Sequence, residues 1–288
     1  MLVLDLTRLL PGPLAGRILA DIGYDVLRLA APGGDLLELA APEAYAWLAG
    51  GKPSETVDLK TPAGVGRLRD LAREAAVLLE TNRPGVMERL GVGPDALRAI
   101  NPRLTYVRIA GYRDPEFHAA PGHDLAYLAA DGLLERFGPA SAAMQIADGT
   151  GAFWAVIAAQ EGVRRGGGFF EVYLAEAARA LAYPPVPGLD GGRVCYGAYP
   201  AAEGRVVLAA LEPHLWDRFC AAAGRPGWAA EAYGPAEAAN PVWLELCALF
   251  AARPAAEWER WALDHGLPLR AAAPPQTPAA ILPWQDRP

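Results

Sequence analysis

Strand-like and helix-like segments alternate through the first 111 residues, and this alternation constrains the fold more than any other feature of the sequence. Amphipathic, helix-like segments occupy residues 14–23 and 62–73. Short apolar runs typical of buried strands occupy residues 3–6, 24–30, 56–59, 75–80 and 104–111. Alternation of this kind predicts an α/β domain with a doubly wound parallel sheet and helices on both faces.

Polar residues follow several of the predicted strands. Residues 79–83 and 108–111 lie at such strand ends, and so does the loop after Leu29. Ligands of doubly wound sheets bind beyond the carboxyl ends of the strands. We therefore expect a binding site where these segments meet.

The second half of the chain predicts a change of domain. A last strand is expected within residues 166–175, so the large domain covers residues 1–184. Residues 185–192 are rich in proline and glycine and form a linker. Residues 193–266, with two short strands and a run of helices, predict a small α+β domain, and residues 267–288 form a C-terminal tail.

Composition limits the classes of partner. The chain is 52% hydrophobic and carries a net charge of −7 without any basic block, which argues against nucleic-acid binding and favours a small-molecule partner. No apolar run is long enough to span a bilayer and no signal peptide is evident, so we expect a cytoplasmic protein without a membrane contact. Its three cysteines, Cys195, Cys220 and Cys247, are too widely spaced to predict a metal site or a disulfide framework.

Three titratable residues are candidates for proton transfer. Asp148 precedes Gly-Thr-Gly and the apolar run 152–159, where a helix N-cap is expected, close to the positive end of the helix dipole. His123 opens an amphipathic segment, and Glu212 precedes Pro213 at the start of a predicted helix. Each is also explained as an ordinary capping residue. An acid and a base that face each other across a cleft are the minimum for moving a proton.

Seven ordered segments resemble the type III CoA-transferase (CaiB/BaiF) and α-methylacyl-CoA racemase family. They are LDLTRLLPGPLAGRILADIGYDVLRLAAPGGD (4–35), VDLKTPAG (57–64), NRPGVMERLGVGPDAL (82–97), LTYVRIAGY (104–112), GHDLAYLAADGLL (122–134), ADGTG (147–151) and LAALEPHLWDRFC (208–220). The resemblance implies a Rossmann-like large domain, a small α+β domain and an interlocked homodimer. In that dimer the small domain of one chain covers the large domain of the other.

The resemblance also implies catalytic roles. Asp148 lies at the position that is a nucleophile in the transferases and an acid/base in the racemases. The Gly-His-Asp and Glu-Pro motifs are similar to the racemase branch, which implies that His123 is the second acid/base and that Glu212 orients it. We therefore expect epimerisation of a 2-methylacyl-CoA by 1,1-proton transfer. Backbone N–H groups at the start of the Gly149 helix would stabilise the enolate, and Gly149 and Gly151 would allow its close approach.

Three basic residues match positions that contact CoA in the family. Arg83 matches a phosphate-contacting arginine, and Lys52 and Lys60 fall on basic positions of the second motif; solvated surface side chains are the alternative for each. No metal and no cofactor other than the CoA of the substrate is expected.

Departures from the family pattern concern the same CoA contacts. Ala30 and Ala31 stand where an acidic and a basic residue are usual, and Gly50 and Pro53 replace basic residues. Two alternatives to the racemase therefore stay open. One is a CoA-transferase with Asp148 as its nucleophile, and the other is a non-catalytic paralogue.

Overall fold

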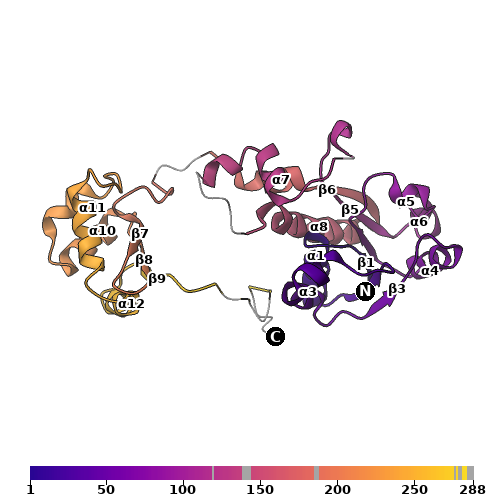
Figure 1. Ribbon diagram of the computed structural model, residues 1–288, viewed down its shortest axis with the longest axis horizontal. Coiled ribbons are helices and arrows are strands. Elements are labelled where there is room, and N and C mark those ends of the chain that lie inside the picture. Colours follow the sequence, from indigo (N-terminus) through magenta and orange to yellow (C-terminus); the bar gives the residue numbers. More distant parts are fainter. Residues whose placement is uncertain (119, 138–143, 185–187, 276, 278–280, 284–288) are drawn as a thin grey trace. The chain divides into compact units, whose positions relative to one another are not determined.

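The structure, a computed structural model, describes residues 1–118, 120–137, 144–184, 188–275, 277 and 281–283. It contains two compact units, a large one built on Met1–Tyr183 and a small one built on Pro184–Thr277. Figure 1 colours the large unit from indigo to rose and the small unit in orange and yellow. Residues 185–187 of the predicted linker, and most of the predicted tail beyond residue 275, lie outside the described residues.

Six parallel strands form the sheet of the large unit, in the order β3-β2-β1-β4-β5-β6. This is the strand order of the Rossmann fold, and it confirms the predicted α/β architecture with a doubly wound parallel sheet. The order reverses between β1 and β4, which lie side by side with Leu4 opposite Leu78. The strands are β1 (Leu2–Leu6), β2 (Asp25–Ala30), β3 (Ser54–Thr56), β4 (Val77–Glu80), β5 (Thr105–Ala110) and β6 (Gly168–Tyr173).

Helices cover both faces of this sheet because successive residues of a strand point to opposite sides. Val3 of β1 packs with Leu19 and Ala155 on one face, which α1 and α8 cover. The next residue, Leu4, packs with Leu68 and Leu97 on the other face, below α4 and α6. The helices are α1 (Pro11–Asp21), α2 (Leu36–Ala40), α3 (Pro42–Ala49), α4 (Pro62–Ala72), α5 (Val86–Arg89), α6 (Pro94–Ile100), α7 (Asp124–Ala130), α8 (Ile146–Arg165) and α9 (Leu174–Ala177).

Strand β3 lies earlier than the sequence predicted. The prediction was residues 56–59, whereas the strand ends at Thr56. Asp58 turns the chain away from the sheet, because its carboxylate accepts a hydrogen bond from the Lys60 N–H (3.0 Å) and its carbonyl accepts one from the Thr61 N–H (3.0 Å). This turn places Lys60 just beyond the carboxyl end of β3.

The small unit has an antiparallel sheet in the order β7-β8-β9. Its core combines aliphatic residues with aromatic ones, among them Trp216, Phe219, Phe250 and Trp258. Residues 269–271, which the sequence assigned to the tail, pair with β8 as the third strand. The elements are β7 (Tyr196–Pro200), β8 (Arg205–Ala209), α10 (Pro213–Ala222), α11 (Pro241–Phe250), α12 (Ala255–Asp264) and β9 (Leu269–Ala271). In the described parts of both units, every helix is too short or too polar to cross a bilayer.

Candidate functional site

The segments that carry His123 and Asp148 meet where two helices of the large unit begin. Helix α7 begins directly after His123, and α8 carries Asp148 in its first turn. The buried carboxylate of Asp124 accepts a hydrogen bond from the Asp148 N–H, with an Oδ1 to N distance of 2.9 Å. N–H groups in the first turn of a helix have no partner within that helix. This bond therefore ties the beginning of α8 to the beginning of α7.

Asp148 is the third residue of α8, and not its N-cap as predicted. The helix begins two residues earlier, at Ile146, with Gln145 as its N-cap. The Asp148 side chain is half-buried, and within the described part of the chain no group donates a hydrogen bond to its carboxylate. Burial and, secondarily, the negative charge of Asp124 raise the pKa of the Asp148 carboxyl to about 7. A carboxyl group with this pKa can give or take a proton at neutral pH.

The two glycines after Asp148 lie in different surroundings. The N–H of Gly149 donates to the Gln145 carbonyl (2.9 Å), and the expectation that N–H groups at the start of this helix stabilise an enolate stays a prediction. A Cβ atom at Gly149 would meet no atom within 4 Å, which leaves room for a ligand beside it. A Cβ atom at Gly151 would lie 2.3 Å from Cδ2 of Leu174. Gly151 therefore allows α8 to pack closely against α9.

Tyr127 holds the loop that leads into α7. Its hydroxyl donates to the Gly122 carbonyl (2.8 Å), and its ring meets the Tyr112 ring edge-on with the centroids 5.3 Å apart. Burial and, secondarily, the charge of Asp148 raise the pKa of Tyr127 to about 12, so the hydroxyl remains a donor at neutral pH. Because His123 is the last residue of this loop, Tyr127 contributes to its position.

His123 and Glu212 occupy equivalent places in different units. His123 is the exposed N-cap of α7, and its carbonyl accepts from the Ala126 N–H (2.8 Å). Glu212 is the exposed N-cap of α10 in the small unit, and its carbonyl accepts from the Leu215 N–H (2.9 Å). Neither side chain makes a capping hydrogen bond. The role predicted for Glu212, to orient His123, stays a prediction.

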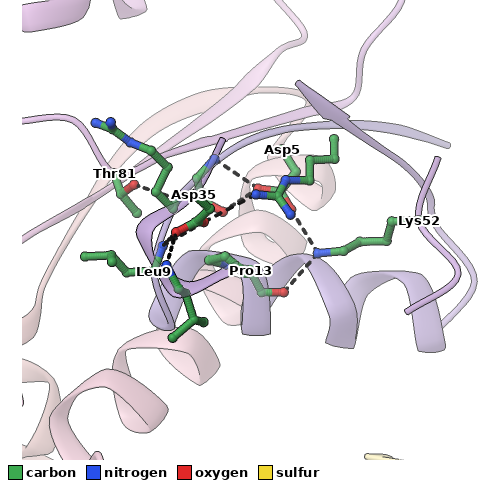
Figure 2. Close-up of polar contacts among 10 residues, drawn as sticks. Asp5, Leu9, Pro13, Asp35, Lys52 and Thr81 are labelled. Atoms are coloured by element: carbon green, nitrogen blue, oxygen red, sulfur yellow. Dashed lines mark hydrogen bonds and ion pairs between the residues drawn. The ribbon is translucent and has the colours of Figure 1, made fainter. Parts of the chain in front are cut away.

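Lys52 does not have the exposed position that a phosphate contact requires. Its ammonium group is 3.1 Å from Asp5 Oδ2 and 3.1 Å from the Pro13 carbonyl, as Figure 2 shows. Both charged side chains are only 1% exposed. The prediction that Lys52 binds CoA is therefore wrong for this structure, and so is the alternative of a solvated surface lysine. The lysine instead neutralises a carboxylate that is buried at the end of β1.

Lys60 and Arg83 are placed as a ligand-binding cation would be. Lys60 follows β3 and Arg83 follows β4, so both lie at the carboxyl edge of the sheet. Both residues are exposed, and no carboxylate of the described chain forms an ion pair with either of them.

A cavity of about 580 Å³ opens at the same edge of the sheet. Its wall comes from the loops after β1, β2, β3 and β4, which is where ligands of doubly wound sheets bind. Lys60 lines it, and so do Ala30 and Ala31, which contribute only methyl groups. The complete lining is residues 6–8, 28–34 and 57–60 with Asn82, Val86 and Leu90.

Comparison with known proteins assigns the chain to a family. The profile of CoA-transferase family III matches residues 1–282, which is nearly the whole chain. The chain belongs to CoA-transferase family III. The resemblance seen in the sequence motifs is thereby confirmed.

Family III relatives with different activities are equally similar to this chain. Human α-methylacyl-CoA racemase is 32% identical over 244 residues, which cover 75% of this chain and 62% of the racemase. A probable fatty acyl-CoA transferase from Mycobacterium tuberculosis is 33% identical over 267 residues, which cover 78% of this chain and 68% of the transferase. The chain thus spans less than two thirds of the human racemase, and identity does not separate the two reactions.

A solved family III structure agrees with the fold. The crystal structure of the same Mycobacterium tuberculosis protein matches this chain with a TM-score of 0.79 at 29% identity. The match covers 95% of this chain and 84% of that one. Both the Rossmann-type sheet and the length of the alignment therefore agree with family III membership.

One residue of this family III site was missed in the sequence. Asp124 is buried and bonded to the backbone of Asp148, although only its neighbour His123 was selected. A signal was present, because an acidic residue at the first position of a helix is a common N-terminal feature. Its partner 24 residues away could not be read from that local signal.

Proposed function

We propose that this family III protein epimerises a 2-methylacyl-CoA thioester by moving the α-proton between two bases, His123 and Asp148. The observation that carries the proposal is the environment of Asp148, a half-buried carboxyl group whose pKa is raised to about 7. A general acid or base works best when its pKa lies near the working pH. A carboxylate nucleophile has the opposite requirement, because it must be ionised.

The proposed reaction balances without a further reactant. His123 takes the α-proton from one face of the substrate, which leaves an enolate conjugated with the thioester. The protonated Asp148 then gives its proton to the opposite face of the same carbon, and the enolate electron pair forms the new C–H bond. In the reverse direction Asp148 is the base and His123 is the acid. No cofactor takes part other than the CoA moiety of the substrate.

The hydrogen bond between Asp124 and Asp148 supports this assignment. It fixes the beginning of α8 to the beginning of α7, so the backbone positions of the two proposed bases are coupled. Catalytic groups must be held close to their working geometry, since small displacements cost much of the rate. A fixed backbone at the beginnings of α7 and α8 would meet this requirement for His123 and Asp148.

Hydrogen exchange tests the proposed function. We expect the wild-type protein, incubated with a 2-methylacyl-CoA in deuterated water, to incorporate deuterium at the α-carbon, as measured by mass spectrometry. Asp148→Asn and His123→Ala should each lower the exchange rate by about two or more orders of magnitude, the usual contribution of a general acid or base. Unaltered exchange in Asp148→Asn would refute the two-base mechanism.

CoA transfer is the second candidate, because a transferase relative matches this chain as well as the racemase does. In that reaction the ionised Asp148 would attack the thioester carbonyl, release CoA thiolate and form an acyl anhydride. Hydroxylamine would then trap Asp148 as a hydroxamate in the presence of acyl-CoA. His123→Ala would leave this trapping intact, which separates the two candidates.

The interlocked homodimer and the role of Glu212 complete the proposal. Glu212→Gln should lower the exchange rate less than His123→Ala does, because an orienting group acts only through the base. Sedimentation equilibrium should give the mass of a dimer. A monomer that is fully active would rule out the dimeric arrangement.

A further inference from the structure

The cavity at the carboxyl edge of the sheet carries uncompensated positive charge. Three cationic side chains line it: Arg8, Arg28 and Lys60. Arg28 is buried and pairs with Asp35, with 3.3 Å between Nη2 and Oδ2. Arg8 and Lys60 are exposed, and neither forms an ion pair with any carboxylate that the structure describes. Among the described residues that line the cavity, Asp58 is the one acidic residue.

Arg8 lies in the loop between β1 and α1, whose backbone is anchored on both sides of it. The N–H of Arg8 donates to Thr81 Oγ1 (3.1 Å). The preceding residue, Thr7, donates from its N–H to Asp5 Oδ1 (3.1 Å), and its hydroxyl contacts the same oxygen. Figure 2 shows these contacts around Asp5 and Thr81. The guanidinium group itself has one polar contact in the described chain, to Asn82 Oδ1 at 3.5 Å.

Leu9, the residue after Arg8, has a strained backbone. Its φ of 64° lies in the left-handed region, which leucine seldom adopts and which costs about 1 kcal/mol or more. Its N–H donates to both carboxylate oxygens of Asp35, at 3.3 and 3.1 Å (Figure 2). The buried Asp35, neutralised by Arg28, thus holds the turn that follows Arg8. Such strain persists only where the surroundings enforce it.

The backbone of this loop has few N–H groups left for a ligand. Those of residues 7–9 donate to side chains of the protein, and Pro11 and Pro13 have none. Rossmann folds commonly bind phosphate through N–H groups at the start of the first helix. In the β1–α1 loop of this protein, few backbone N–H groups are available to bind phosphate in this way. An anion in this cavity must therefore be held mainly by side chains.

We propose that Arg8, together with Lys60, binds a phosphate group at the nucleotide end of the acyl-CoA substrate. Arg8 thereby supplies from the β1–α1 loop the positive charge that Ala31, just after β2, does not supply. The inference rests on the proposed function for its substrate, a CoA thioester. The guanidinium group suits this role because it can donate two parallel hydrogen bonds to phosphate oxygens.

Titration calorimetry with CoA tests the role of Arg8. We expect Arg8→Ala to raise the Kd for CoA by about tenfold to a hundredfold, the usual effect of losing charged hydrogen bonds. Lys60→Ala should raise the Kd for CoA less than Arg8→Ala does. The Kd of Arg8→Lys should lie between those of Arg8→Ala and the wild-type protein. Arg103→Ala is the matched control, because Arg103 is an exposed arginine that precedes β5, at the opposite edge of the sheet. Equal Kd values for Arg8→Ala and Arg103→Ala would overturn the inference.

A truncated substrate distinguishes this inference from the proposed function. In the exchange assay Arg8→Ala should raise KM for a 2-methylacyl-CoA and leave kcat unchanged. For the corresponding pantetheine thioester, which lacks the nucleotide, it should change neither constant. Loss of affinity for both substrates would refute a phosphate contact. The wild-type protein could also catalyse exchange on the pantetheine thioester without binding CoA. That result would refute the inference but would not contradict the proposed function.

Competition identifies the source of the phosphate. Adenosine 3′,5′-bisphosphate should displace CoA from the wild-type protein and bind more weakly to Arg8→Ala. If it bound beside CoA without displacing it, the cavity would serve a separate nucleotide, contrary to the proposal. If CoA binding depended on Arg8 while no α-proton exchange occurred, the inference would hold and the proposed epimerase would be wrong.

Discussion

Asp148 titrates near neutral pH because its surroundings disfavour its charged form in two ways. Half-burial removes water from the carboxylate, and the buried Asp124 places a second negative charge nearby. Asp124 also accepts a hydrogen bond from the Asp148 N–H, so one side chain both positions the residue and adjusts its pKa. Removing the charge of Asp124 and keeping its shape separates these two contributions.

We expect Asp124→Asn to lower the pKa of Asp148 below its wild-type value of about 7. Burial still raises this pKa in the variant, but the repulsion between the two carboxylates is gone. The amide oxygen can still accept the hydrogen bond. The proposed exchange uses Asp148 as an acid in one direction and as a base in the other, so its rate should follow a bell-shaped curve with its maximum near the pKa of Asp148, about 7. In Asp124→Asn the bell should move to lower pH.

The shape of the wild-type curve is informative in itself. A rate that rises with pH and then stays level would indicate an ionised nucleophile and would favour CoA transfer. An unshifted bell in Asp124→Asn would show that the charge of Asp124 does not act on the pKa of Asp148.

Helix α8 combines a packing face with a first turn that carries Asp148. Its buried residues are alanines and glycines: Ala147, Gly151, Ala152, Ala155, Ala159 and Gly162. Small side chains let a helix approach its neighbours closely, and a well-packed helix holds its first turn in place. The position of Asp148 thus depends on the packing of residues farther along α8.

We expect Gly151→Val to destabilise the large unit by about 1–3 kcal/mol, the usual cost of overpacking a filled site. The new Cβ would lie 2.3 Å from the Leu174 side chain, and the branched group would extend the clash. Gly149→Ala is the matched control two residues earlier, where a Cβ meets no atom within 4 Å. It should stabilise the helix by about 0.5–1 kcal/mol.

Urea unfolding followed by circular dichroism measures both free energies. If Gly151→Val and Gly149→Ala had equal free energies of unfolding, the close packing of α8 against α9 would be contradicted. A higher KM in Gly149→Ala, despite its greater stability, would indicate that substrate approaches this glycine.

At the scale of the whole molecule, the two units have separate hydrophobic cores. The large unit has one core on each face of its parallel sheet, and the small unit has its own core. Segments with separate cores can unfold separately. A ligand that binds only the folded form raises the stability of the unit to which it binds.

We therefore expect scanning calorimetry to show two unfolding transitions. CoA should raise the midpoint of the large-unit transition, because the proposed nucleotide site lies entirely within that unit, and should leave the other transition in place. The transition with the larger change in far-ultraviolet circular dichroism is that of the large unit, because α1–α9 contain more helical residues than α10–α12. A single transition, or an equal rise of both midpoints with CoA, would contradict this expectation.

The sequence by itself determined the fold class and the segments that form the site. Alternating strands and helices identified the parallel sheet because side-chain periodicity and turn residues act locally. The motifs around His123 and Asp148 carried the family resemblance. The error at β3 was small: the strand begins two residues and ends three residues earlier than predicted, because the turn at Asp58 outweighed the strand-like pattern.

Only the tertiary structure decided which charges are available to a ligand. Lys52 and Arg8 are both basic residues that lie beside β1 and α1. Lys52 is buried and pairs with Asp5, whereas Arg8 lines the cavity and forms no ion pair in the described chain. The buried pair joins residues 47 positions apart. Such partners depend on which loops come together at the edge of the sheet, and the local sequence does not show which loops these are. The physical reason is that burial and pairing, more than residue type, set the electrostatic role of a charge.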